Sequence, residues 1–185
     1  MRRYVALLRG INVGGRNKVA MADLRQVAAD LGFTDVSTYI QSGNLLFAAD
    51  ERDAAGMAAS LERRIAERLG VRPAVVVMSA AELAQVIADN PFADEPNPRL
   101  VHAVLRNADL GDTGRAAVAA AVATAQSSGS RDEAVVVGRT LYLHTPDGFG
   151  RSQLAAQLAA SSAQASGTAR NWATVTRLMA LLTGE

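Results

Sequence analysis

Three short segments of the chain combine glycines with arginines or lysines, the residue types that bind anions. The first is RGINVGGRNK at residues 9–18, which follows an apolar run and carries two arginines and a lysine. Successive glycine N–H groups form a nest for an anion, and neighbouring cations neutralise its charge. The others are PDGFGRS at residues 146–152 and GTARNW at residues 167–172. Each lies at the predicted start of a helix, where free N–H groups favour phosphate.

A purely structural interpretation stays open for each segment. Glycine is the usual residue of turns, so a flexible loop with solvated cations also explains residues 9–18. Gly10 and Gly15 have the spacing of a P-loop, but that motif continues with Lys and Ser or Thr. This chain has Arg16 and Asn17 there, and therefore lacks the hydroxyl that binds Mg²⁺. The residues exclude a Walker site and leave a weaker prediction of an anion site.

The segment YIQSGN, residues 39–44, adds a second group of polar side chains. Gln41, Ser42 and Asn44 place amide and hydroxyl groups at a predicted hairpin turn, where they would read the polar edge of a ligand. The alternative is that Gly43 and Asn44 only satisfy the backbone angles of the turn.

Composition excludes several classes of function. The chain has 185 residues, of which 49% are hydrophobic and 20% charged, and it contains no cysteine. Disulfides, thiolate metal sites and cysteine nucleophiles are therefore excluded, and a reducing compartment fits. We find no secretory signal pattern and no run approaching the ~20 apolar residues of a membrane span. We expect a cytoplasmic protein without a membrane partner.

Charge is distributed unevenly although the net charge is only +1. Five cations and no carboxylate precede Asp23, and the segment from Gly148 to Gly184 holds three arginines and no carboxylate. Such segregation produces a local positive field on a nearly neutral protein.

The remaining chemistry-bearing residues indicate neither a metal site nor a hydrolase. His102 and His144 lack metal-ligand spacing with another His, Asp or Glu, and no nucleophile elbow occurs. Trp172 lies on an apolar helix face, which favours a place in the core over stacking on a base. We predict no metal and identify no cofactor or catalytic residue.

Apolar spacing predicts an α+β fold. The first half runs strand, helix, hairpin, helix and strand, at residues 4–10, 21–31, 36–49, 57–69 and 73–78. This β-α-β-β-α-β order is the ferredoxin-like split βαβ arrangement. A capping box at Ser79 and Glu82 opens a further helix, and the proline-rich stretch 90–98 is the best linker candidate.

The second half echoes the first in order. We predict a strand, a helix, a hairpin and a helix at residues 100–106, 112–126, 134–145 and 152–160. A Ser/Ala/Gly stretch at 161–168 then precedes a last helix that GTARNW opens, with Thr168 or Asn171 as its cap. The segment VHAVLRN also resembles VALLRG of the first half. We therefore expect two ferredoxin-like or related subdomains with antiparallel or mixed sheets: residues 1–79, a helix and linker at 80–99, and residues 100–185.

Taken together, the motifs resemble a known family. YVALLRGINVGGRNKV, YIQSGN, NPF, LYLHTPDGFGRS and TARNWATV occur in this order between residues 4 and 182, as in the bacterial family known as domain of unknown function 1697. Arg16 and Ala20 stand where the family has lysine and proline. The resemblance implies an α+β fold with ferredoxin-like subdomains and implies no activity. It also marks polar loop positions, including Gly43 and Asn90, which suggests binding more than packing.

From these features we expect the protein to bind a phosphate-bearing small molecule, such as a nucleotide, through Gly-rich loops and Arg side chains. We expect the loop at 9–20 and the turn at 41–44 to lie at opposite ends of the first sheet. Arg9 would then join the helix starts of PDGFGRS and GTARNW. The predicted ligand-binding residues are Arg9, Gly10, Asn12, Gly14, Gly15, Lys18, Gln41, Ser42, Asn44, Arg151, Ser152, Arg170 and Asn171.

Two alternative functions stay open. A nucleic-acid-binding module fits a ferredoxin-like sheet, but the missing aromatic motifs and a pI of 8.2 disfavour it. A protein-interaction or structural module would use the Ala-rich helices at 116–125 and 155–160 to form a homodimer. We expect a monomer or a homodimer.

Overall fold

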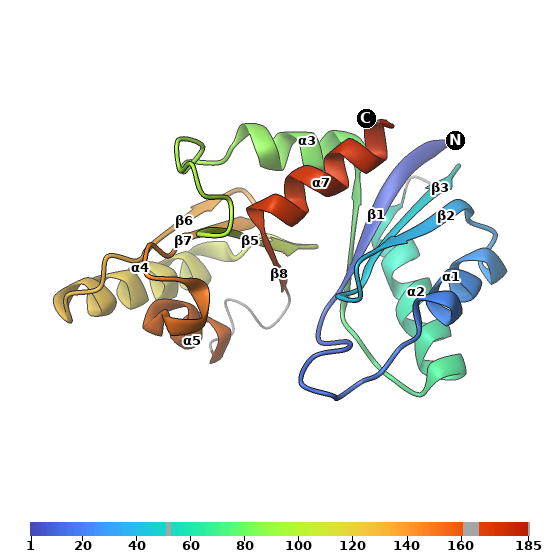
Figure 1. Ribbon diagram of the computed structural model, residues 1–185, viewed down its shortest axis with the longest axis horizontal. Coiled ribbons are helices and arrows are strands. Elements are labelled where there is room, and N and C mark those ends of the chain that lie inside the picture. The colour runs from blue at the N-terminus through green and yellow to red at the C-terminus, as the bar shows by residue number, and fades with distance from the viewer. Residues whose placement is uncertain (51–52, 161–166, 185) are drawn as a thin grey trace. The chain divides into compact units, whose positions relative to one another are not determined.

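The computed structural model in Figure 1 describes residues 1–50, 53–160 and 167–184. The chain divides into two compact units: Met1–Gln85 with Leu178–Glu185, and Val86–Arg177. Each unit contains a four-stranded antiparallel sheet together with helices. The predicted α+β fold with two subdomains is confirmed.

The first unit follows the predicted β-α-β-β-α-β order. Its elements are β1 (Arg2–Leu8), α1 (Met21–Asp30), β2 (Thr34–Tyr39), β3 (Asn44–Ala49), α2 (Ala54–Leu69) and β4 (Val75–Ser79). The strands lie in the order β2-β3-β1-β4, and every neighbouring pair is antiparallel. Figure 1 shows α1 and α2 covering one face of this sheet.

The core of the first unit follows from the period of its elements. Alternate residues of β1, namely Tyr4, Ala6 and Leu8, face a core that they share with Leu24 of α1 and Leu61 of α2. The remaining β1 residues between them are also buried. From Tyr4 to Leu8, β1 is therefore buried on both faces, as expected for an inner strand of the sheet.

Helix α3 (Ala80–Ala88) follows β4 directly and begins with the predicted capping box. The Ser79 N–H donates to Glu82 Oε2 at 2.8 Å, and the Glu82 N–H donates to Ser79 Oγ at 3.3 Å. The division into units falls within α3 and within the last helix, α7 (Trp172–Thr183).

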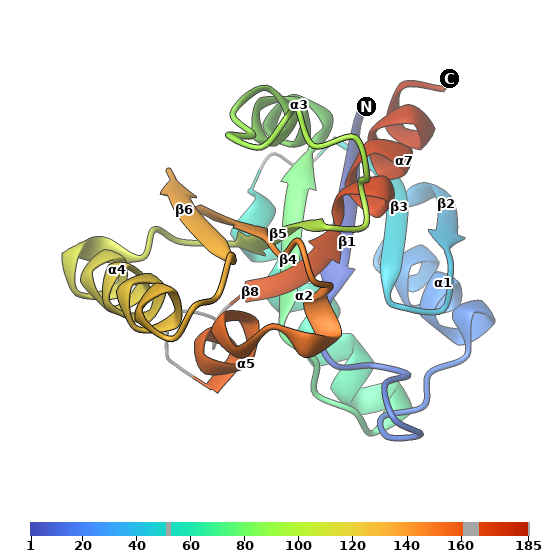
Figure 2. The same cartoon turned by 60° about the vertical axis from the view of Figure 1, so that its left-hand side comes forward.

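The second unit repeats the order of the first. Its elements are β5 (Val101–Arg106), α4 (Gly111–Ser127), β6 (Glu133–Val137), β7 (Thr140–His144), a 3-10 helix (Phe149–Arg151), α5 (Gln153–Ala160) and β8 (Gly167–Asn171). The sheet order is β6-β7-β5-β8, which is the same topology as that of the first sheet. Figure 2 shows α4 and α5 lying next to each other, and both contribute to a core with Val104, Leu141 and Leu143.

Strand β8 corrects one prediction: residues Gly167–Asn171 form a strand, and of the two predicted caps of the last helix it is Asn171 that lies at its start. Residues Gly167–Asn171 pair with β5, and Gly167 lies opposite Arg106. A Cβ at Gly167 would lie 2.7 Å from Val104 Cγ1 and 3.0 Å from the Leu105 carbonyl, so glycine permits this close approach. Residues 161–166 of the predicted Ser/Ala/Gly stretch lie outside the described residues.

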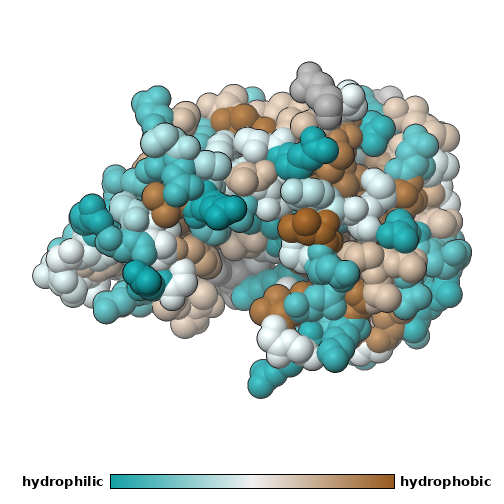
Figure 3. Space-filling view, in the orientation of Figure 1, coloured by the Kyte–Doolittle hydropathy of each residue, from teal (hydrophilic) through white to brown (hydrophobic). Residues whose placement is uncertain are grey.

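Hydrophobic side chains on the surface are scattered. On the face seen in Figure 3, hydrophobic residues form small patches between hydrophilic ones. Across the described ranges, the large apolar residues that are exposed are Met1, Val13, Ile40 and Val135. None of the helices described has both the length and the apolar character needed to cross a bilayer.

Candidate functional site

The β1–α1 loop, residues 9–20, is held in shape by two of its own asparagines. The Asn12 N–H donates to the Asn17 carbonyl at 3.1 Å, and Asn17 Nδ2 donates to the Gly10 carbonyl at 2.9 Å. Asn12 Oδ1 accepts from the Val19 N–H at 2.9 Å, and Asn12 Nδ2 donates to the Val19 carbonyl at 2.9 Å. The loop is therefore folded back on itself by specific contacts.

The β1–α1 loop and the β2–β3 turn meet, which overturns the prediction that they lie at opposite ends of the sheet. Asn12 Nδ2 also donates to the Gln41 carbonyl at 2.9 Å. The reason is topological: β1 and β3 are antiparallel neighbours, with Leu7 opposite Asn44. The end of β1 and the start of β3 therefore lie at the same edge of the unit.

Two residues of the β2–β3 turn are fixed by packing. Gly43 has a φ of +79°, and its carbonyl accepts from the Leu8 N–H at 2.8 Å. Leu8 lies so close that a Cβ at Gly43 would be 2.9 Å from Leu8 Cβ. Asn44 is fully buried and donates to the Tyr39 carbonyl at 3.0 Å and to Ser42 Oγ at 3.1 Å. These contacts support the structural interpretation for Gly43 and Asn44, and leave Gln41 and Ser42 at the surface of the turn.

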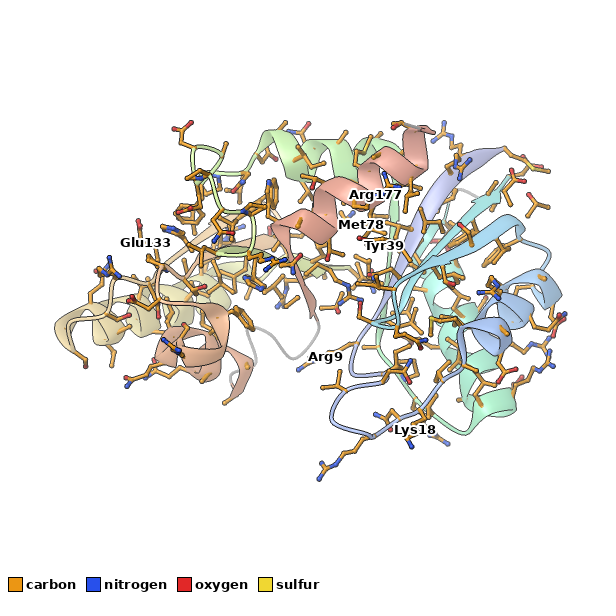
Figure 4. The ribbon with its side chains drawn as sticks, viewed as in Figure 1. Arg9, Lys18, Tyr39, Met78, Glu133 and Arg177 are labelled. Atoms are coloured by element: carbon orange, nitrogen blue, oxygen red, sulfur yellow. The ribbon has the colours of Figure 1, made fainter. Side chains whose placement is uncertain are left out.

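The outer part of the β1–α1 loop presents cations and backbone donors. Gly14, Gly15, Arg16 and Lys18 are exposed, and Figure 4 shows Arg9 and Lys18 on this loop. Among the described residues, no hydrogen-bond partner occurs for the N–H groups of Gly14 and Gly15, nor for the side chains of Arg16 and Lys18. No acidic residue precedes Asp23. The loop segment is therefore rich in donors and contains no carboxylate of its own, and Asp23 lies in the first turn of the helix that follows.

Backbone conformation adds to this arrangement. Five loop residues have positive φ: Gly10, Asn12, Gly14, Gly15 and Asn17. Helix α1, which the loop enters, has no side-chain cap at Ala20, so its first N–H groups add donors at the same end.

The helix start of PDGFGRS is organised differently. Ser152 caps α5 as predicted, because its Oγ accepts from the Ala155 N–H at 2.8 Å. The same hydroxyl donates to Asp132 Oδ2 at 2.8 Å, and Asp132 is buried. Asp132 and Asp147 line the surface pocket at this helix start together with Arg151. The two carboxylates oppose an anion here, and a local reading of PDGFGRS does not reveal Asp132.

Arg170 and Asn171 end β8. Asn171 caps α7, because its Oδ1 accepts from the Thr174 N–H at 2.8 Å. Arg170 is buried, and its Nη1 donates to Thr168 Oγ1 at 2.7 Å and to the Ala169 carbonyl at 2.8 Å. Burial lowers the pKa of Arg170 to about 10. Arg170 belongs to the second unit and Arg9 to the first, and their convergence stays a prediction.

The two histidines have different environments within the second unit. His102 stacks on Phe149 with ring centroids 4.0 Å apart, and burial lowers its pKa to about 4. His144 Nε2 lies 2.8 Å from Glu95 Oε2, and its Nδ1 lies 3.5 Å from Glu133 Oε1. Within the part of the chain that the structure describes, no group of three or more His, Asp or Glu side chains is arranged to hold a metal ion.

Two residues that shape the β1–α1 loop and the β2–β3 turn, Asn17 and Ile40, were not among the predicted site residues. Asn17 closes the β1–α1 loop, and the tolerance of asparagine for positive φ was the available signal. Ile40, next to the contact at Gln41, has a φ of +49°, which is strained for a β-branched residue. No local pattern predicts a positive φ at this β-branched residue.

Comparison with known protein families identifies the family of this chain. The model of a family described as protein of unknown function (DUF1697) matches residues 1–142. The chain belongs to this family. The matched range of the DUF1697 protein includes the β1–α1 loop and the β2–β3 turn, and ends before Arg151, Ser152, Arg170 and Asn171.

A solved structure resembles this DUF1697 protein along its whole length. The conserved bacterial protein SP0830 from Streptococcus pneumoniae is 24% identical, covers 98% of each chain and gives a TM-score of 0.75. At this identity the likeness concerns the fold alone. No curated protein sequence matches the chain.

Proposed function

We propose that this DUF1697 protein binds a phosphate-bearing small molecule, such as a nucleotide, through the β1–α1 loop. The observation that supports the proposal is the loop itself: exposed N–H groups at Gly14 and Gly15 lie beside Arg16 and Lys18, with no carboxylate in the segment. Gly14 and Gly15 lie in a turn closed by the Arg16 N–H and the Val13 carbonyl at 3.0 Å, and successive N–H groups of a turn form a concave anion site. Arg16 and Lys18 supply the charge that neutralises a phosphate.

Rigidity of the loop favours binding. The contacts of Asn12 with Val19 and Gln41 hold the loop in one conformation before a ligand arrives. A preorganised loop loses less conformational entropy on binding than a flexible one. Gln41 and Ser42, in the turn that docks on the loop, are placed to read polar groups of the remainder of the ligand.

Isothermal titration calorimetry tests the proposal. The titrants are inorganic phosphate, nucleoside mono-, di- and triphosphates, and a sugar phosphate. We expect saturable heat with at least one of them, and about tenfold to hundredfold weaker binding by an Arg16→Gln/Lys18→Gln variant, because two charge-assisted contacts are lost. The matched control is Arg63→Gln/Arg64→Gln, which makes the same charge change on α2. It should bind as the wild type does.

Two results would overturn the proposal. One is the absence of saturable heat with every phosphate compound. The other is an equal loss of affinity in the loop variant and in the α2 control, which would reduce the effect to net charge. Single-stranded RNA, added as a further titrant, addresses the nucleic-acid alternative, because counterion release gives that binding a steep dependence on salt.

A further inference from the structure

The second unit joins its first loop to its hairpin turn at the same topological position as the first unit does. The β5–α4 loop, residues 107–110, is linked to the β6–β7 turn by two arginines. Arg115 Nη2 donates to the Gly138 carbonyl at 3.1 Å, and Arg139 Nη1 lies 3.5 Å from the Asn107 carbonyl. In the first unit the corresponding link is made by the Asn12 amide.

Arg106, the last residue of β5, brings a third guanidinium to this end of the second unit. Its side chain is only 5% exposed. Neither Nε nor Nη1 has a hydrogen-bond partner among residues 1–50, 53–160 and 167–184. Its Cγ packs against Gly167 of β8, where a Cβ would lie 3.0 Å away. Buried donors are almost always paired in folded proteins, so these two require a partner.

Asp109, a carboxylate of this region, is already paired with one of these three arginines. Asp109 accepts two contacts from Arg115 Nη2, at 2.8 and 3.0 Å, and one from the Gly111 N–H at 2.9 Å. Asp109 still favours the charged form of Arg106, although burial acts in the opposite direction and lowers its pKa. Asp112 is exposed in the first turn of α4. Asp109 is therefore already paired with Arg115, and Arg106 forms no ion pair with any of the described residues.

We propose that Arg106, Arg115 and Arg139, here called the arginine cluster, bind a small oxyanion, either a phosphate or a carboxylate. The unpartnered Nε–H and Nη1–H groups of Arg106 supply charged hydrogen-bond donors for an oxygen of such a group. Arg115 and Arg139 contact the turn and the loop beside Arg106, and Asp109 balances the charge of Arg115. This site lies in the second unit and is independent of the β1–α1 loop.

Arginine Nε–H signals in ¹H–¹⁵N NMR spectra of the full chain test the proposal. Phosphate and acetate are titrated separately at constant ionic strength, with chloride as the balancing anion. The Arg106 signal is assigned by its loss in Arg106→Lys. We expect saturable shifts of the Arg106 and Arg139 signals, and no shift for Arg131, an exposed arginine of the same unit that pairs with Asp147.

Comparison of the two titrations identifies the source of the oxyanion. Saturation by phosphate alone assigns the cluster to phosphate compounds, and saturation by acetate assigns it to carboxylates. An Arg106→Met variant should bind about tenfold more weakly than the wild type, as expected for the loss of a charged hydrogen bond. An Arg131→Met variant should bind as the wild type does.

The proposal is overturned if neither anion produces a saturable shift at Arg106 and Arg139 up to about 50 mM, a concentration above the millimolar dissociation constants of weak ligands. Should Arg106→Met fail to fold, Arg139→Gln carries the same test, because Arg139 is partly exposed. The backbone N–H signals of Gly14 and Gly15 report on the β1–α1 loop in the same spectra, so failure of one site is distinguishable from failure of the other.

Discussion

Replacement of Gly43 by alanine tests whether the β2–β3 turn and the β1–α1 loop are packed as one structure. Gly43 has a φ of +79°, and an added Cβ would lie 2.9 Å from Leu8 Cβ and 3.0 Å from Ile11 Cγ1 and Cδ1. The left-handed backbone costs an alanine about 1–2 kcal/mol. Insertion of a methyl group into a packed site costs a further 1–3 kcal/mol or so. We therefore expect Gly43→Ala to destabilise the first unit by about 2–5 kcal/mol.

Gly32 provides the matched control. Its φ is +83°, but no atom lies within 4 Å of a Cβ built there. Gly32→Ala therefore carries only the backbone cost, about 1–2 kcal/mol. The difference between the two variants isolates the packing of the turn against Leu8 and Ile11.

Native-state hydrogen exchange is the suitable assay, because two compact units need not unfold in a single transition. Protection of the N–H groups of β1 and β3 gives the free energy of opening of the first unit directly. Equal losses in Gly43→Ala and Gly32→Ala would refute the reasoning, since they would mean that the turn and the loop do not pack tightly.

Three further predictions concern the second unit. The pKa of Glu95 is lowered first by the hydrogen bond from the Asn97 N–H and second by the hydrogen bond with His144. The ionised Glu95 therefore stabilises the fold above its unfolded pKa of 4.5, and this stabilisation is lost as the pH falls. Glu95→Gln should therefore be less stable than wild type in urea unfolding at pH 7, and the difference should vanish in acid. Burial lowers the pKa of His102 from 6.5 to about 4, so between these pH values the unfolded chain binds a proton at His102 and the folded chain does not. The free energy of unfolding should therefore decrease as the pH is lowered from 6.5 to about 4. An NMR titration of the His102 ring with a midpoint near 6.5 would contradict this. Ser152→Ala removes the cap of α5 and should cost about 1–2 kcal/mol in urea unfolding, whereas an unchanged midpoint would show that the cap is dispensable.

The sequence predicted the first unit well because each of its elements carries a strong local signal. Apolar residues at helical spacing mark α1 and α2; Gly70 directly follows α2, and Gly32 follows α1 after Leu31. Strand β8 was missed for the opposite reason. The segment GTARN has no apolar alternation, and its extended conformation depends on pairing with β5, a contact between distant parts of the sequence.

The binding role of the glycines and cations of the β1–α1 loop stays a prediction. The predicted position of this loop, at the opposite end of the sheet from the β2–β3 turn, was wrong. The correct relation follows from the antiparallel β1–β3 pairing. The carboxylate of Asp132 at the start of α5 was invisible for a different reason, because it lies 20 residues away in sequence from the Ser152 hydroxyl that it contacts.

The sequence similarity between VALLRG and VHAVLRN does not pair the residues that occupy equivalent positions in the two units. Matching VALLRG to VHAVLRN aligns Leu8 with Leu105. Leu8 faces the core formed with α1 and α2, whereas in β5 it is the neighbouring Val104 that faces α4 and α5. A shift of one residue exchanges the faces of a strand. The repeat is therefore one of topology, and arginines that match in the echo are not equivalent in the structure.

The shared topology explains why both candidate anion sites occur at the same end of their units. In each sheet the first strand pairs antiparallel with the second strand of the hairpin, so the first loop must meet the hairpin turn. The contact is made by the Asn12 amide in one unit and by the Arg115 guanidinium in the other. Since different side chains make the same junction, the topology fixes the junction and leaves the choice of ligand to the local residues. We therefore expect substitutions in the arginine cluster to leave phosphate binding at the β1–α1 loop unchanged, and the calorimetric and NMR titrations above measure the two independently.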